Sequence, residues 1–112
     1  MLAREKRRNP RLRVHLPLRY QIRGTPEYSN SLCEDISLGG LSFINDKFIA
    51  PSTPLKLEIN VLSRILSPQA RIAWAAPLAH SDRYRMGVEF LEISPQEKNY
   101  LSDYLDIHTT KV

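Results

Sequence analysis

The sequence predicts an all-β domain, a small antiparallel barrel or sandwich that ends in one C-terminal α-helix. Six segments either alternate apolar with polar residues or are rich in β-branched and aromatic residues, and both patterns indicate strands. These segments span residues 16–22, 31–37, 41–44, 54–62, 70–76 and 84–91. Turn residues dominate the stretches between them, namely RGTPEYSN, NDKFIAPST, SRILSP and PLAHSD. About six strands separated by turns are typical of a small antiparallel barrel or sandwich.

One helix is expected near the C-terminal end, in the stretch SPQEKNYLSDYLDI. Ser94 is the expected N-cap, Pro95 suits the first helical position, and Glu97 is placed to complete a capping box. One apolar stripe along this helix is formed by Tyr100, Leu101, Tyr104 and Leu105. We expect the stripe to cover an open end of the barrel, and the alternative is that the helix binds a partner.

The chain has 112 residues, enough for one domain with a modest core. We divide it into a basic N-terminal arm at 1–13, a barrel domain with its helix at 14–107 and a tail at 108–112. No apolar run approaches the ~20 residues that a membrane helix needs, so we expect no membrane insertion and a cytoplasmic location. Because Cys33 is the only cysteine, no internal disulfide can form, and we expect it to pack in a strand.

The positive charge of the chain is concentrated at its N-terminal end. Residues 1–24 hold eight of the 16 basic residues and one acidic residue, Glu5, whereas the chain as a whole carries a net charge of +4. Such an arm often contacts nucleic acid, an anionic membrane surface or a phosphate ligand. The alternative is a solvated, disordered terminus without a ligand.

The histidine residues give no support for catalysis. His15, His80 and His108 are far apart in the sequence, and none has the spacing of a nucleophile, a general base or a metal ligand. The sequence contains no phosphate-binding or dinucleotide-binding fingerprint. We therefore expect a protein that is not an enzyme and needs no cofactor or metal.

The basic arm contains two arginine residues at a spacing that suits an anion. Arg7 and Arg11 lie four residues apart, Arg8 follows the first, and Pro10 precedes the second. Pro10 disfavours a helix at the preceding residue, so we expect this segment to form a loop that leads into the first strand. A guanidinium group can meet a phosphate or the O6/N7 edge of guanine with two hydrogen bonds, and it can stack on a base.

A second candidate site lies in the stretch EDISLGGLSF, where two glycine residues interrupt strand-like sequence. Asp35 and Ser37 are two residues apart, so on a strand they would share one face and offer a carboxylate and a hydroxyl side by side. Gly39 and Gly40 would allow a turn and the close approach of a ligand. The alternative is a strand end followed by a turn, with Asp35 and Ser37 bonded to local backbone.

Together, the two motifs resemble those of the PilZ domain family. The pattern RxxxR at Arg7 and Arg11 is followed by DxSxxG, which places Asp35, Ser37 and Gly40 at its fixed positions. The later stretch YRMGVEFLEISPQEKNYLSDYL resembles the closing strand and C-terminal helix of the family. The resemblance extends from about residue 5 to residue 105.

The resemblance implies a six-stranded antiparallel β-barrel that binds the bacterial second messenger cyclic di-GMP. In the family, the arginine residues of the arm contact phosphate and guanine, and the Asp and Ser of the second motif contact a guanine edge. Those roles fall here on Arg7, Arg11, Asp35 and Ser37, with Gly39 and Gly40 allowing close approach. Arg8 is a further candidate, for stacking on a second guanine, which would affect whether one or two nucleotides bind.

The function that the resemblance implies is that of a stand-alone receptor. Such a receptor relays cyclic di-GMP to a partner protein and regulates processes such as motility, biofilm formation or exopolysaccharide production. We expect a monomer or a weak homodimer with an unidentified protein partner. The alternative is a small β-barrel that binds nucleic acid through its basic arm, and the few aromatic residues available for base stacking argue against it.

Trp74 is the only tryptophan of the chain. It shares an expected strand face with Ile72 and Ala76, and this pattern favours a position in the core. The alternative is a position at the rim of the barrel, at the edge of the nucleotide pocket.

Overall fold

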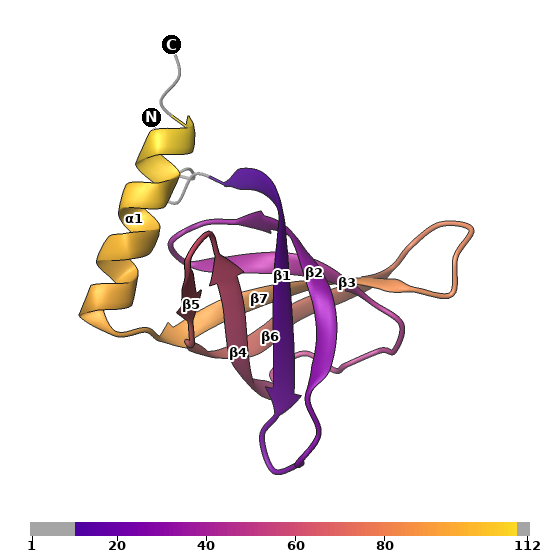
Figure 1. Ribbon diagram of the computed structural model, residues 1–112. Helices are drawn as coiled ribbons and strands as arrows, with labels where there is room; N and C mark the ends of the chain where they lie inside the picture. Colours follow the sequence, from indigo (N-terminus) through magenta and orange to yellow (C-terminus); the bar gives the residue numbers. More distant parts are fainter. Residues whose placement is uncertain (1–10, 110–112) are drawn as a thin grey trace, which may run out of the picture.

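The computed structural model describes residues 11–109 and contains seven strands and one helix (Figure 1). The strands are β1 (Leu12–Ile22), β2 (Ser29–Ile36), β3 (Gly40–Asn45), β4 (Pro54–Val61), β5 (Arg64–Leu66), β6 (Gln69–Pro77) and β7 (Tyr84–Glu92), and the helix is α1 (Pro95–Thr109). β1 thus begins two residues before the expected start of the barrel domain, and α1 continues two residues beyond its expected end.

Six of the strands form a closed antiparallel barrel. The strand order is β1-β2-β3-β7-β6-β4, and a further pairing between β1 and β4 closes the ring. Closure leaves few unpaired strand edges, which a small sheet in water must otherwise protect. The expected six-stranded barrel with one C-terminal helix is therefore confirmed.

The seventh strand, β5, lies in the stretch SRILSP, where the sequence indicated only a turn. β5 pairs with β4 through Asn60 and Ile65 and through Val61 and Arg64, so the two strands form a tight hairpin. Leu62 lies in its two-residue turn with a φ of 56°, as expected for a turn that follows the twist of the strands. A strand of three residues gives no usable alternation, and this is why the sequence pattern missed it.

The core forms because each barrel strand alternates between inward and outward residues. In β1, every second residue from Val14 to Tyr20 is buried, and the residues between them are exposed. The other strands add apolar side chains that are fully or almost fully buried, among them Cys33, Ile36, Leu41, Phe43, Leu55, Leu57, Ile59, Val61, Ile72, Met86 and Val88. The expected buried position of Cys33 is confirmed, since its exposed fraction is 0%.

The position expected for Trp74 is wrong, because a β-bulge interrupts β6. The register between β6 and β7 shifts between Ile72 and Trp74, so Ala73 is an extra residue that reverses the alternation. Ile72 is 1% exposed, whereas Trp74 is 44% exposed. The indole therefore lies on the outer surface of the barrel and not in the core.

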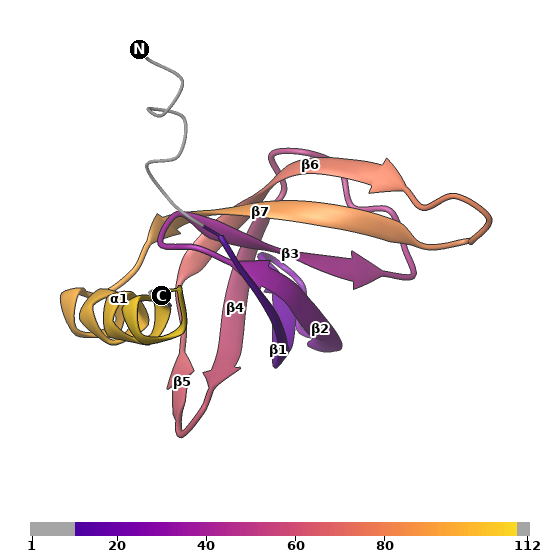
Figure 2. The same cartoon turned by 90° about the horizontal axis from the view of Figure 1, so that it is seen from above.

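The helix α1 packs beside the barrel next to β5, as Figures 1 and 2 both show. Leu101, Tyr104 and Leu105 are buried, and the hydroxyl of Tyr100 donates a hydrogen bond of 3.0 Å to the carbonyl of Val61 in β4. The expected packing role of the apolar stripe is confirmed. Among the described residues, no helix is long and apolar enough to cross a membrane.

The expected capping box of α1 is only half formed. Ser94 Oγ accepts a hydrogen bond of 3.2 Å from the amide of Glu97, as an N-cap does. The carboxylate of Glu97 instead accepts a hydrogen bond of 3.2 Å from the amide of Ser67, in the loop after β5. Glu97 therefore ties the helix to the barrel.

Candidate functional site

Two of the sequence-predicted site residues meet on the outer surface at one end of the barrel. Arg11, the residue before β1, donates from Nη1 to Asp35 Oδ1 at 2.5 Å. Asp35 lies near the end of β2, and its side chain is 29% exposed, while that of Arg11 is 52% exposed. The structure thus brings together residues that are 24 positions apart and come from two different motifs.

The second oxygen of Asp35 has a partner that the sequence analysis did not identify. Ser42 in β3 donates from Oγ to Asp35 Oδ2 at 2.8 Å, and Ser42 is only 3% exposed. The register explains this contact, because Asp35 and Ser42 are cross-strand partners next to the pair of Ile36 and Leu41. A hairpin with its loop at 37–39 and Ile36 opposite Leu41 would have predicted the pair from the sequence.

A second cation lies beside Asp35. Arg13 in β1 is the cross-strand partner of Asp35, and its side chain is exposed. Within the described part of the chain, no hydrogen bond or ion pair engages this side chain. Arg13 therefore adds a positive charge next to the pair of Arg11 and Asp35, and the period of two in β1 was the signal that could have placed it there.

Ser37 does not lie beside Asp35 on a strand face, so this expectation is wrong. β2 ends at Ile36, and Ser37 is 2% exposed at the start of the turn. Its Oγ accepts a hydrogen bond of 3.1 Å from the amide of Gly39 and lies 3.3 Å from the carbonyl of Gly40, to which it donates. Its amide also donates to the carbonyl of Gly40 at 2.8 Å. The hydroxyl is used by the turn because residues 37–39 lie outside the two strands.

The Gly pair serves the packing of the turn against β7. A Cβ atom on Gly40 would lie 2.0 Å from the carbonyl oxygen of Val88, so no side chain fits at this position. The carbonyl of Gly39 accepts a hydrogen bond of 2.9 Å from the amide of Phe90. The structure therefore accounts for Gly40 by the close approach of a neighbouring strand.

Cys33 lies in β2, two residues before Asp35, and its thiol is buried. Its thiol donates to the backbone carbonyl of Asp35 at 3.2 Å. Burial, followed by the nearby Asp35 charge, raises the pKa of the Cys33 thiol to about 12. A thiol with such a pKa is not a nucleophile at neutral pH. Within residues 11–109, no cluster of His, Cys, Asp and Glu could hold a metal ion.

Trp74 lies in the same transverse row of outer residues as Asp35. Ser42 is the cross-strand partner of Asp35 on one side and of Gly87 on the other, and Gly87 in turn pairs with Trp74. A Cβ atom on Gly87 would lie 2.2 Å from Trp74 Nε1, so the indole rests on the bare backbone of Gly87. The row thus ends in an exposed aromatic ring.

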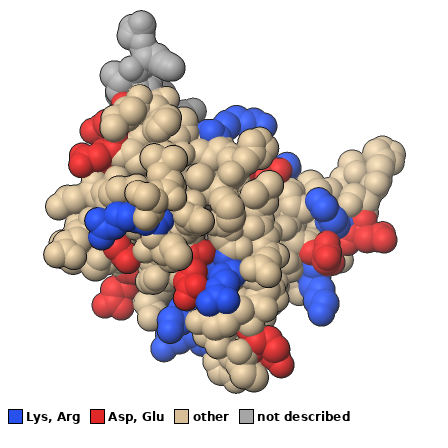
Figure 3. All heavy atoms as spheres, viewed as in Figure 1, with Lys and Arg blue, Asp and Glu red and all other residues tan. Residues whose placement is uncertain are grey.

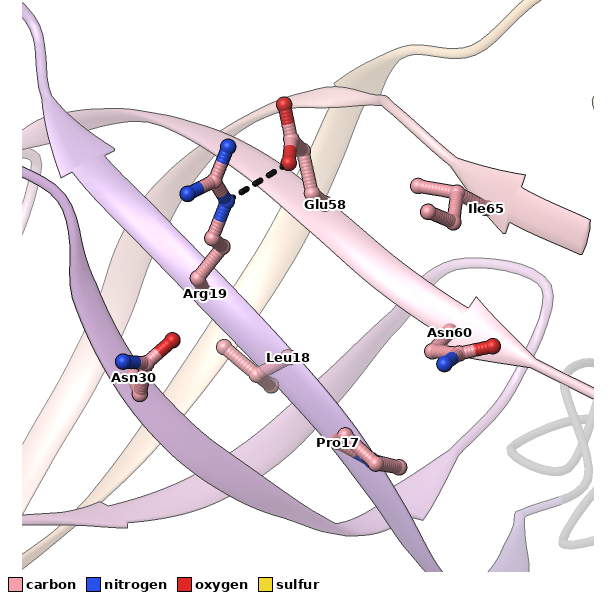
Figure 4. Close-up of a pocket in the computed structure, with 7 residues that line it drawn as sticks. All are labelled: Pro17, Leu18, Arg19, Asn30, Glu58, Asn60 and Ile65. Atoms are coloured by element: carbon pink, nitrogen blue, oxygen red, sulfur yellow. Dashed lines mark hydrogen bonds and ion pairs between the residues drawn. The ribbon is translucent and has the colours of Figure 1, made fainter.

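A separate open pocket of about 180 Å³ lies on another part of the outer surface (Figure 4). It is lined by Pro17, Leu18, Arg19, Asn30, Glu58, Asn60 and Ile65. Arg19 donates to Glu58 at 2.7 Å and lies 4.2 Å from the ring centre of Tyr28. None of the residues that the sequence predicted for the site lines this pocket. Its arginine, Arg19, already interacts with Glu58 and with Tyr28.

Two predicted site residues, Arg7 and Arg8, lie outside the described residues. The structure therefore describes Arg11, Asp35, Ser37, Gly39 and Gly40 of the predicted set. Of these, Arg11 and Asp35 face the open surface together, and the other three build the adjoining turn.

The fold and the site define a small closed β-barrel with a flanking C-terminal helix and an arginine–aspartate cluster where the basic arm enters. The family model of the PilZ domain matches residues 5–106. The chain belongs to the PilZ domain family.

Solved structures share this fold at low sequence identity. Bacillus subtilis inhibitor of motility (MotI/DgrA) superposes with a TM-score of 0.78 at 20% identity, over 93% of this chain and 53% of that one. The PilZ domain of YcgR from Escherichia coli, solved with c-di-GMP, gives 0.73 at 15% identity, over 92% and 91% of the two chains. The K. pneumonia MrkH–c-di-GMP complex gives 0.71 at 19% identity, over 89% and 51%.

The chain thus spans about half the length of the MotI/DgrA and MrkH chains and nearly all of the YcgR PilZ domain. Comparison with curated protein sequences gives no match.

Proposed function

We propose that this protein binds cyclic di-GMP at the cluster of Arg11 and Asp35 and acts as a receptor that relays the messenger to a partner protein. The observation that carries the proposal is the contact between Arg11 and Asp35 at 2.5 Å on the open surface. The two residues belong to the two motifs of the family, and a ligand at this point can touch both. The family match over residues 5–106 supports the same assignment.

The chemistry of the two side chains suits a guanine nucleotide. A carboxylate accepts hydrogen bonds, and guanine has donors at N1 and N2, whereas adenine has an acceptor at N1 and nothing at position 2. Asp35 is proposed to receive the guanine edge. Arg11, together with Arg7 and Arg8 of the arm, is proposed to bind phosphate or the O6/N7 edge.

The turn next to Asp35 is proposed to shape the site. The hydroxyl of Ser37 is bonded within the turn, and Gly40 lies against β7. Both therefore contribute by closing the turn and by keeping side chains away from the ligand. Trp74, which is 44% exposed in the same row of residues, is proposed to border the ligand.

The output of the receptor is proposed to be a protein contact that affects motility, biofilm formation or exopolysaccharide production. The chain shares its fold with 53% of the inhibitor of motility from Bacillus subtilis. A change of shape or charge on ligand binding is proposed to carry the signal.

The nucleic-acid alternative is not favoured by the charge distribution. On the face shown in Figure 3, Lys and Arg side chains of the described residues lie among Asp and Glu side chains. Among the described residues, ion pairs join Arg19 with Glu58, Arg71 with Glu89 and Arg85 with Glu34. A nucleic-acid-binding surface needs a continuous basic patch, which the barrel does not present on this face.

Titration calorimetry tests the proposal with cyclic di-GMP, cyclic di-AMP, GTP, cyclic GMP and a short oligonucleotide as separate ligands. We expect saturable heat with cyclic di-GMP and weaker or no binding of the others. Absence of heat with cyclic di-GMP at high micromolar concentration, or tighter binding of the oligonucleotide, would overturn the proposal.

A further inference from the structure

We infer that Ser42 is a positioning residue that orients the Asp35 carboxylate for the guanine edge and so contributes to base selection. The inference rests on the proposed binding of cyclic di-GMP. Ser42 belongs to neither motif of the sequence, and its role follows from the contacts of the described residues.

The first step is the contact itself. Ser42 Oγ donates to Asp35 Oδ2 at 2.8 Å, while Arg11 Nη1 donates to Oδ1 at 2.5 Å. Each carboxylate oxygen thus receives one donor from within the protein. Each oxygen can accept a further hydrogen bond, so both oxygens can still receive donors of a guanine base.

The second step is that Ser42 is more firmly held than Arg11. Ser42 is 3% exposed and sits in β3 between β2 and β7, with Asp35 and Gly87 as its cross-strand partners. Arg11 is 52% exposed at its side chain and precedes the first strand. The buried hydroxyl is therefore the fixed anchor of the carboxylate, and the arginine is the partner that a ligand can displace or share.

The third step concerns the torsion of the carboxylate. The last side-chain torsion of an aspartate is broad, so an Asp35 held only by an exposed arginine would sample many orientations. A hydrogen bond from a buried donor restricts this torsion before the ligand arrives. Restricting a binding group in its bound orientation lowers the entropy lost on binding.

The test uses the full chain, with Ser42→Ala to remove the hydroxyl and Ser42→Thr to restore it. Ser31→Ala is the matched control, because Ser31 Oγ donates to the backbone carbonyl of Ile44 at 2.7 Å and does not contact Asp35. Asp35→Ala reports whether the carboxylate itself binds. Dissociation constants for cyclic di-GMP and cyclic di-AMP and the melting temperature are measured for each variant.

We expect Ser42→Ala to bind cyclic di-GMP roughly three- to tenfold more weakly, the effect of losing one typical hydrogen bond. The ratio of the two dissociation constants should narrow by about the same factor, because adenine has no donor at N1 or at position 2, where guanine is proposed to meet the carboxylate. Ser42→Thr should regain most of the affinity, and Ser31→Ala should leave both constants unchanged even if its melting temperature falls.

Three results would overturn the inference. In the first, Ser42→Ala binds both nucleotides as the parent does while Asp35→Ala loses affinity. This result would mean that the carboxylate of Asp35 does not need the hydrogen bond from Ser42. Ser42→Ala could weaken both nucleotides equally, as expected of a purely structural residue. A parent chain that does not bind cyclic di-GMP at all would remove the proposed function together with this inference, and only that result affects both.

Discussion

The stretch DISLGG contains two regions that are adjacent in sequence and differ in almost every physical property. Asp35 points outward, with its side chain 29% exposed and in contact with Arg11 and Ser42. Ser37, two residues later, is 2% exposed and bonded to the backbone of its own turn. Gly40 lies so close to β7 that a Cβ atom would be 2.0 Å from a carbonyl oxygen.

The difference shows that one short motif can combine two kinds of constraint. The outward half, Asp35 with its partner Arg11, presents charged groups to solvent, where their contribution to the stability of the fold is small. The inward half, residues 37–40, closes the hairpin between β2 and β3 and packs it on β7, where any added atom lowers the stability of the fold. Variants in the two halves should therefore separate into those that change binding and those that change stability.

The largest expected effect belongs to the inward half. Gly40→Ala should lower the free energy of unfolding by about 3 kcal/mol or more, because the new Cβ atom meets backbone that cannot move aside. Gly24→Ala is the control: Gly24 has a φ of 93° and free space around it, so only backbone strain of roughly 1 kcal/mol is expected. Denaturant unfolding measures the free energy of unfolding of both variants. A Gly40→Ala variant as stable as the parent would mean that the turn can shift away from β7.

The next effect belongs to the outward half and compares two arginine residues. Arg11→Ala should weaken cyclic di-GMP binding by about 1.5–3 kcal/mol, roughly tenfold or more, without lowering the melting temperature. Arg19→Ala is the matched control, since Arg19 has a side-chain exposure of 47% against 52% for Arg11 and also donates to a carboxylate. Arg19 is held by Glu58 and Tyr28 away from the candidate site, so its loss should leave binding intact. Equal binding by the Arg11→Ala and Arg19→Ala variants would contradict the assignment of Arg11.

Asp35 should determine which base is accepted. Asp35→Ala should weaken the binding of cyclic di-GMP. The difference in binding free energy between cyclic di-GMP and cyclic di-AMP should narrow by roughly 1–3 kcal/mol, as expected for one good base contact. Asp35→Asn keeps one acceptor oxygen and the size of the side chain, so it should retain part of the affinity. Binding and melting are measured for both variants. Unchanged base preference with a lowered melting temperature would assign Asp35 to the turn.

The sequence predicted the architecture well because it depends on patterns that extend over whole strands. Six segments of period two, with a capped helix after them, indicated a small barrel or sandwich with one helix, and the resemblance to the PilZ domain family selected the barrel. Trp74 was placed wrongly because a single extra residue, Ala73, reverses the alternation, and no residue type in AWAA marks a bulge. The three residues of β5 were too few to show a period.

The site was predicted in part, for a related reason. Arg11 and Asp35 could be paired because each belongs to a recognisable motif. The expectation for Ser37 assumed that the strand continues through it, whereas β2 ends at Ile36. The hydroxyl that meets Asp35 comes from Ser42 across the hairpin, and only the register of two strands gives that contact.

The smallest expected effect tests whether Ser37 belongs wholly to the inward half. Ser37→Ala removes the bonds of its hydroxyl to Gly39 and Gly40 in a buried position, so the free energy of unfolding should fall by about 1 kcal/mol. The advantage of cyclic di-GMP over cyclic di-AMP should stay at the parent value, because the hydroxyl faces the turn and not the carboxylate of Asp35. Thermal unfolding and calorimetry with both nucleotides, run beside Ser42→Ala, make the measurement. A Ser37→Ala variant that keeps its melting temperature but loses base preference would mean that the turn opens on binding and gives its hydroxyl to the base, and the division between the two halves would then hold only for the free protein.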